Sequence, residues 1–72
     1  MTTYATKFQQ VIDEGVPEDD RTIVALAANR MMNMTGGRPS DAARSEVRHY
    51  QRLGAAEYRR QWEAERESER TR

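Results

Sequence analysis

One segment of the sequence is apolar almost all round: residues 22–28, which read Thr-Ile-Val-Ala-Leu-Ala-Ala. A helix that is apolar on every face is covered by other elements on most of its sides. Its alanines are small enough to let a neighbouring helix approach closely. The segment therefore predicts the central helix of a small all-α domain.

The flanking residues set the limits of this helix at about 17–34. Pro17 suits the first helical turn, because its missing N–H would have no intrahelical partner there. The carboxylates at 18–20 crowd the same turn, where the helix dipole favours them. Residues 35–39, Thr-Gly-Gly-Arg-Pro, break the helix at its other end.

A first helix is expected before it, over about residues 3–14. Its apolar residues recur at i, i+4, i+7 and i+8, the spacing of one helical face: Tyr4, Phe8, Val11 and Ile12. Gly15 is the type of residue that ends a helix in the left-handed conformation. Val16 precedes a proline, a position that disfavours helix.

A third, long and amphipathic helix is expected over about residues 40–66, with Ser40 as its N-cap. Six residues form an apolar stripe within about a 120° arc of a continuous helix: Ala43, Val47, Tyr50, Gly54, Tyr58 and Trp62. Gly54 leaves an alternative open, since it could end one helix at Leu53 and precede another at Ala55. We expect one helix, because the stripe keeps its phase across the glycine, although glycine costs about 1 kcal/mol relative to alanine there.

Residues 1–66 are expected to form a single domain, and residues 67–72 a polar tail that frays. A chain of 72 residues buries only about 60% of the surface that it exposes when unfolded. The sequence has no cysteine for disulfides, which leaves oligomerisation as the support for so small a core. We therefore expect a homodimer whose interface uses Val47, Tyr50, Gly54, Tyr58 and Trp62.

No residue pattern indicates catalysis, and we expect a non-enzymatic protein without a metal or cofactor. His49 is the single histidine, whereas zinc and iron sites need more nitrogen or sulfur ligands. The acidic residues at 18–20 lack the alternating ligands of a calcium loop. No Gly-Lys-Ser/Thr follows the glycines at 36–37, so they do not form a phosphate loop. The serines lack a histidine that a carboxylate orients for nucleophilic catalysis.

Charge is unevenly distributed, although its sum is zero. Residues 1–22 carry two basic and five acidic residues, and residues 23–72 carry ten arginines and seven acidic residues. Arg44, Arg48 and Arg52 are spaced i, i+4 and i+8, and on a continuous helix Arg59 lies on the same side. Such a row can grip an acidic protein surface, follow a phosphate backbone or form a solvated face.

The leading hypothesis is a protein-binding regulator or inhibitor that presents this helix to an acidic surface of a larger partner. Arginine, tyrosine and tryptophan are the usual energetic anchors of interfaces. The predicted partner-binding residues are Arg44, Arg48, Arg52, Arg59, Tyr58 and Trp62. Small size, bipartite charge and lack of a catalytic site are typical of regulators of phage or mobile-element type. The methionines at 31, 32 and 34 either fill the core or form an adaptable binding surface.

The first alternative is a dimeric DNA-binding regulator with residues 40–53 in the major groove. The predicted nucleic-acid contacts are Arg38, Arg44, Arg48 and Arg52, with Arg38 near the minor groove. The break at 35–39 lies where a helix-turn-helix has its turn, but it is longer than the usual three or four residues. The second alternative is a structural subunit of a larger assembly.

The sequence does not predict a membrane protein. The longest apolar stretch, residues 23–28, is far shorter than the ~20 residues of a membrane span. The N-terminus has no basic region that leads into an apolar segment, so we expect no signal peptide. We expect a soluble, cytoplasmic protein.

Overall fold

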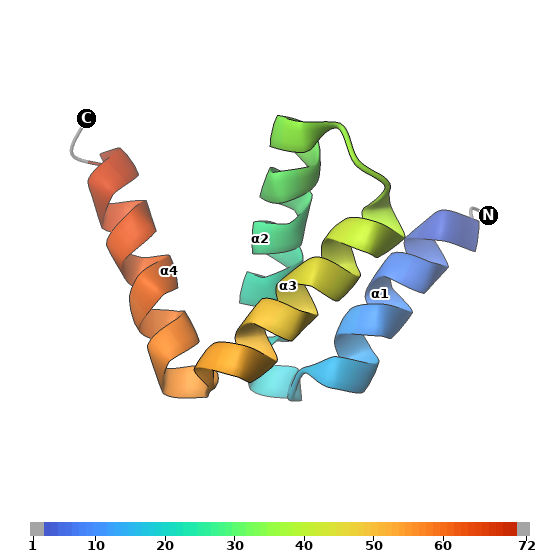
Figure 1. Ribbon diagram of the computed structural model, residues 1–72. Helices are drawn as coiled ribbons and strands as arrows, with labels where there is room; N and C mark the ends of the chain where they lie inside the picture. Colours follow the sequence, from blue (N-terminus) through green and yellow to red (C-terminus); the bar gives the residue numbers. More distant parts are fainter. Residues whose placement is uncertain (1–2, 71–72) are drawn as a thin grey trace.

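The computed structural model describes the backbone of residues 3–70 and the side chains of residues 7–70. These residues form four helices: α1 (Thr3–Gly15), α2 (Glu18–Thr35), α3 (Pro39–Leu53) and α4 (Ala55–Arg70). The all-α prediction is confirmed, but the expected third helix over 40–66 is wrong. It is divided into α3 and α4, which meet at an angle (Figure 1).

Gly54 is the residue that separates α3 from α4. Its backbone has φ 87° and ψ 158°, a conformation that glycine adopts without the Cβ penalty of other residues. Its N–H still donates to the carbonyl oxygen of Tyr50 at 2.9 Å, and its own carbonyl accepts from the N–H of Tyr58 at 3.0 Å. Gly54 therefore caps one helix and starts the next, and the chain changes direction between them.

The core lies among α1, α2 and α3, with α4 added at one end. Its buried apolar residues come from all four helices and the α1–α2 connection: Ile12, Val16, Val24, Ala28, Ala42, Ala43, Val47, Tyr50 and Tyr58. The side chain of Tyr4, which we expected on the apolar face of the first helix, lies outside the described residues.

The central element is α3 rather than the apolar helix α2. α3 packs against each of the other three helices, and in Figure 1 it crosses in front of α2 and runs beside α1. Segment 22–28 is covered on one face only, since Val24 and Ala28 are buried while Leu26 is 50% exposed. The sequence expectation failed because α3 covers one face of α2, while Leu26, which lies beside Phe8 and Gln9 of α1, stays open to solvent.

Gly15 allows close packing and does not cap α1 in the left-handed conformation. The glycines with positive φ in the described residues are Gly36 and Gly54, and Gly36 is the left-handed cap of α2. A Cβ atom at Gly15 would overlap with Cγ1 of Val47. The missing side chain therefore lets the end of α1 approach α3, and the Gly15 carbonyl accepts a hydrogen bond from Gln51 at 3.2 Å.

The polar C-terminal segment is helical to Arg70, beyond the expected limit near residue 66. Arg30 of α2 pairs with two glutamates of α4, Glu65 at 3.7 Å and Glu69. The residues from Glu63 to Arg70 are all exposed, and Thr71 and Arg72 of the expected tail lie outside the described residues. No helix within residues 3–70 is long and apolar enough to cross a membrane.

Replacing Gly15 with alanine tests the contact between α1 and α3. Overpacking a well-packed core costs about 1–3 kcal/mol, so we expect Gly15→Ala to lower the free energy of unfolding by that amount in urea denaturation. The control is Gly37→Ala, where φ is not positive and the nearest atom to a new Cβ is Oγ1 of Thr35 at 3.5 Å. Equal stability of the two variants would show that α1 and α3 are not held this closely.

Candidate functional site

The carboxylate of Asp20 joins three helices. Asp20 lies in the first turn of α2 and is 2% exposed. Its Oδ1 accepts from Nε of Arg59 at 2.7 Å, and its Oδ2 accepts from Nη2 of Arg59 at 3.0 Å and from the hydroxyl of Tyr50 at 2.5 Å. Tyr50 is on α3 and Arg59 on α4, so we call these three residues the Asp20 latch.

The latch keeps Asp20 ionised. The hydrogen bond from Arg59 lowers the pKa of the Asp20 carboxyl, and the hydrogen bond from Tyr50 lowers it further, against the opposing effect of burial. Burial raises the pKa of Tyr50, and donation to Asp20 adds to this. The hydrogen bond to Asp20 also raises the pKa of Arg59. The charged pair with a neutral tyrosine donor is therefore the stable state at neutral pH.

The latch changes the interpretation of Arg59, which we predicted to bind a partner. Its guanidinium fork is engaged by Asp20, 39 residues away in sequence. No helical spacing rule relates residues that far apart, so the sequence did not reveal this pair. The acidic residues at 18–20 were interpreted as a group favoured by the helix dipole, which fits exposed Glu18 and Asp19 but not buried Asp20.

The predicted dimer stripe is mostly inside the chain. Val47, Tyr50 and Tyr58 are buried by the other helices, Gly54 is exposed in the α3–α4 joint, and Trp62 is half-buried. The dimer expectation assumed that short helices leave the stripe partly uncovered. This assumption is wrong because α1 and α2 pack against α3 over Val47 and Tyr50, and Tyr58 of α4 packs against Tyr50. Homodimerisation itself stays a prediction, with Trp62 as the large stripe residue that a second copy could still reach.

Three predicted binding residues form an exposed row along α3: Arg44, Arg48 and Arg52, here called the arginine row. Arg44 pairs with Asp41 at 3.3 Å, and Nη2 of Arg52 lies 3.0 Å from Nδ1 of His49. Arg48 makes no hydrogen bond or ion pair within the described residues. Arg38 is exposed in the α2–α3 connection.

Beside the arginine row, α2, α3 and α4 enclose a groove, here called the α4 groove. It consists of three adjoining cavities of about 450, 260 and 50 Å³, which share Glu46 and Glu65 in their walls. Arg48 and Arg52 line the largest cavity, and Met31 lines the two larger ones. The neighbouring methionines have different surroundings. Met34 lines the middle cavity and is 78% exposed, whereas Met32 is half-buried.

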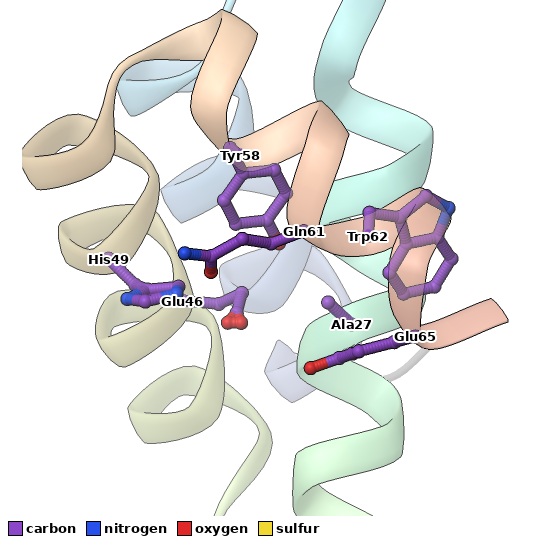
Figure 2. Close-up of a pocket in the computed structure, with 7 residues that line it drawn as sticks. All are labelled: Ala27, Glu46, His49, Tyr58, Gln61, Trp62 and Glu65. Atoms are coloured by element: carbon purple, nitrogen blue, oxygen red, sulfur yellow. The ribbon is translucent and has the colours of Figure 1, made fainter. Parts of the chain in front are cut away.

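The smallest cavity has a polar floor. Figure 2 shows Glu46 and His49 of α3 opposite Tyr58, Gln61 and Glu65 of α4. Glu46 is 7% exposed, and this burial raises the pKa of its carboxyl. The Tyr58 hydroxyl is buried without a hydrogen-bond partner in the described residues, and burial, followed by the nearby Glu46 and Glu65 charges, raises its pKa.

Glu46 is a site residue that sequence reasoning missed. It follows Ala43 by three positions and precedes Tyr50 by four, which is the spacing of the buried face of α3. A carboxylate at such a position is the available signal. Within the part of the chain that the structure describes, no three histidine or acidic side chains are placed to hold a metal ion. The cavity can instead accept hydrogen bonds or a positive charge.

Removing the Asp20 carboxylate tests the latch. Asp20→Ala leaves the buried hydroxyl of Tyr50 without an acceptor, which costs about 1–3 kcal/mol, and it frees α4. We expect a lower thermal midpoint, and the control Asp19→Ala, an exposed neighbour in the same turn, to melt close to the parent. A midpoint for Asp20→Ala equal to that of Asp19→Ala would contradict the latch.

The latch also predicts a pH dependence. Because the folded pKa of Asp20 lies below its ordinary value of 3.8, its ionic contribution is complete above that value and is lost as the pH falls through the folded pKa. Urea denaturation should therefore show the difference in stability between parent and Asp20→Ala shrinking below about pH 4. A difference that stays constant from pH 7 to pH 2 would show that ionisation of Asp20 contributes nothing.

Comparison with known proteins identifies no relative of this chain. No family model matches the sequence, and neither a curated protein nor a solved structure matches it significantly.

Proposed function

We propose that the protein is a small, non-enzymatic regulator or inhibitor that binds an acidic surface of a larger protein through the arginine row. The observation that carries this proposal is the placement of Arg44, Arg48 and Arg52 on the outer face of α3, next to the α4 groove. Arginine is the preferred cation for bidentate contacts with carboxylates. An acidic helix or loop laid along α3 would meet all three.

The α4 groove offers apolar contacts in addition to the charges of the arginine row. Exposed ion pairs contribute only about 0–1 kcal/mol each, so a stable complex needs buried apolar contacts as well. Met31 and half-buried Trp62 line the groove beside the row, and tryptophan is among the residues that most often dominate binding energy. A partner side chain that enters the groove would bury both.

The division of charge over the surface favours a protein partner over a nucleic acid. The chain is neutral overall, whereas nucleic-acid-binding domains are usually basic. α4 presents exposed glutamates at 63, 65, 67 and 69, which a phosphate backbone would repel. A protein partner can avoid or complement them.

DNA binding remains the second candidate because of one structural observation. The connection between α2 and α3 is residues 36–38, shorter than the expected break at 35–39, and three residues is within the usual length of a helix-turn-helix connection. This removes the objection that the turn is too long, and Arg38 is exposed within it. DNA binding would weaken steeply with salt and be competed by any duplex.

Charge reversal in the arginine row tests the proposal. Arg48→Glu with Arg52→Glu should lose the protein that the parent retains from a nuclease-treated cell lysate, because a charged interface contact left unpaired can cost 2 kcal/mol or more, or about 30-fold in Kd. Both residues are exposed, so the melting temperature should change little.

The control is Arg66→Glu with Arg70→Glu, which makes the same change in net charge on α4 and should keep the partner. Equal retention by both double variants would show that the arginine row is only a solvated face. Retention that disappears on nuclease treatment of the parent would favour DNA binding instead.

A further inference from the structure

The smallest cavity of the α4 groove brings the hydroxyl of Tyr58 together with the carboxylate of Glu46. The Tyr58 side chain is 4% exposed, and its hydroxyl forms no hydrogen bond of normal geometry within the described residues, although it lies near enough to the Glu46 carboxylate for that charge to raise the pKa of Tyr58. A buried hydroxyl without a well-formed hydrogen bond costs about 1–3 kcal/mol, and a polar group that enters the cavity would remove this cost. Glu46, which shares this cavity, is buried and forms no ion pair within residues 7–70.

We propose that this cavity binds the ammonium group of a lysine side chain supplied by a partner protein. A lysine ammonium carries three donors, and the cavity offers three kinds of acceptor: the carboxylate of Glu46, the hydroxyl oxygen of Tyr58 and the amide oxygen of Gln61. Figure 2 shows the Gln61 side chain extended towards Glu46 and His49. Trp62 lines the cavity as well.

The size of the cavity favours ammonium over guanidinium. A volume of about 50 Å³ holds roughly three or four groups the size of a water molecule, at about 10–15 Å³ each. The ammonium and the last methylenes of a lysine fill that space. A guanidinium group is larger and planar, and it would need acceptors arranged around its edge.

The charges around the cavity are consistent with this occupant. Glu65 lies at its rim, 65% exposed, and shares its charge with Arg30. Glu46 on the floor pairs with no arginine, and the basic side chain in the same wall is His49. Arg48 and Arg52 line the adjoining cavity, and Arg52 lies against His49 rather than Glu46. The site for a further positive charge is therefore the buried end of the groove, away from the arginine row.

The inference is independent of the proposed function, since the arginine row contributes no atom to the lining of this cavity. The probe is the tripeptide acetyl-Gly-Lys-Gly amide, titrated at constant ionic strength. Trp62 is the single tryptophan of the chain, so its fluorescence reports binding, and NMR of the Gln61 side-chain amide locates it. We expect saturable changes at both residues and a Kd at least tenfold lower than for the norleucine tripeptide, which keeps the methylenes and lacks the charge.

Two variants distinguish a bound ammonium from a structural role of the same residues. Glu46→Gln should weaken lysine-peptide binding at least fivefold, and Tyr58→Phe about threefold. Both variants should fold. Burial raises the pKa of Glu46, so ionised Glu46 makes the folded state less stable as the pH rises, and a neutral glutamine avoids this cost. Phenylalanine at position 58 removes a hydroxyl that forms no well-defined hydrogen bond. The control Glu63→Gln, exposed on α4, should bind like the parent.

Three results would overturn the proposal. Equal affinity for the lysine and norleucine peptides would show that the charge is not recognised. Unchanged binding by folded Glu46→Gln or Tyr58→Phe would place the lysine elsewhere. Tighter binding of the arginine tripeptide than of the lysine tripeptide would show that the site is not built for ammonium.

Discussion

One buried carboxylate, that of Asp20, positions α4 and with it the shape of the whole surface. α4 contributes little apolar area to the core, because Tyr58 is its single fully buried side chain in the described residues and Trp62 is half-buried. A 16-residue helix with so few contacts is marginal in water by itself. The bidentate hydrogen bonds from Arg59 to Asp20 therefore supply the orientation that apolar packing alone leaves loose.

The two buried carboxylates of the protein have opposite surroundings. Asp20 has a cation and a hydroxyl donor, and its pKa is lowered chiefly by the hydrogen bond from Arg59. Glu46 forms no ion pair within residues 7–70, and burial raises its pKa against the opposing effect of His49. The rings of Tyr50 and Tyr58 connect the two environments, since they pack edge to face with centroids 5.1 Å apart. Tyr50 donates a hydrogen bond to Asp20 in the latch, and Tyr58 lines the smallest cavity.

Local sequence patterns predicted the helices and much of the core, and failed where distant residues decide the structure. The spacing of Ala43, Val47 and Tyr50 identified the buried face of α3. The stripe also kept its phase across Gly54, but Tyr50 and Tyr58 reach one core from two helices rather than from one. Phase alone cannot distinguish these arrangements, because a glycine with positive φ can redirect the chain while both segments still face the same core.

The candidate site was less predictable than the fold for the same reason. Spacing on one helix identified the exposed arginine row, since Arg44, Arg48 and Arg52 all belong to α3. The same spacing assigns Arg59 to that row only if α3 and α4 form one continuous helix. The cavity escaped prediction because its walls come from Ala27, Glu46 and Trp62, on three different helices. A cavity whose walls come from several helices can be identified only once the packing of those helices is known.

The Asp20 latch and the α4 groove both depend on the placement of α4. α4 is held near its start by Arg59 and is joined to α3 through Gly54, whose added Cβ would meet no atom within 4 Å. At its far end the contact is with Arg30, through exposed carboxylates that solvent screens. The first turns of α4 are therefore fixed and the last turns are weakly held, so the groove can widen most towards Met34 and least at Tyr58. A ligand that bridges Glu46 and Gln61 adds a second attachment between α3 and α4, and by linkage it must stabilise the latched state to the extent that it binds that state better.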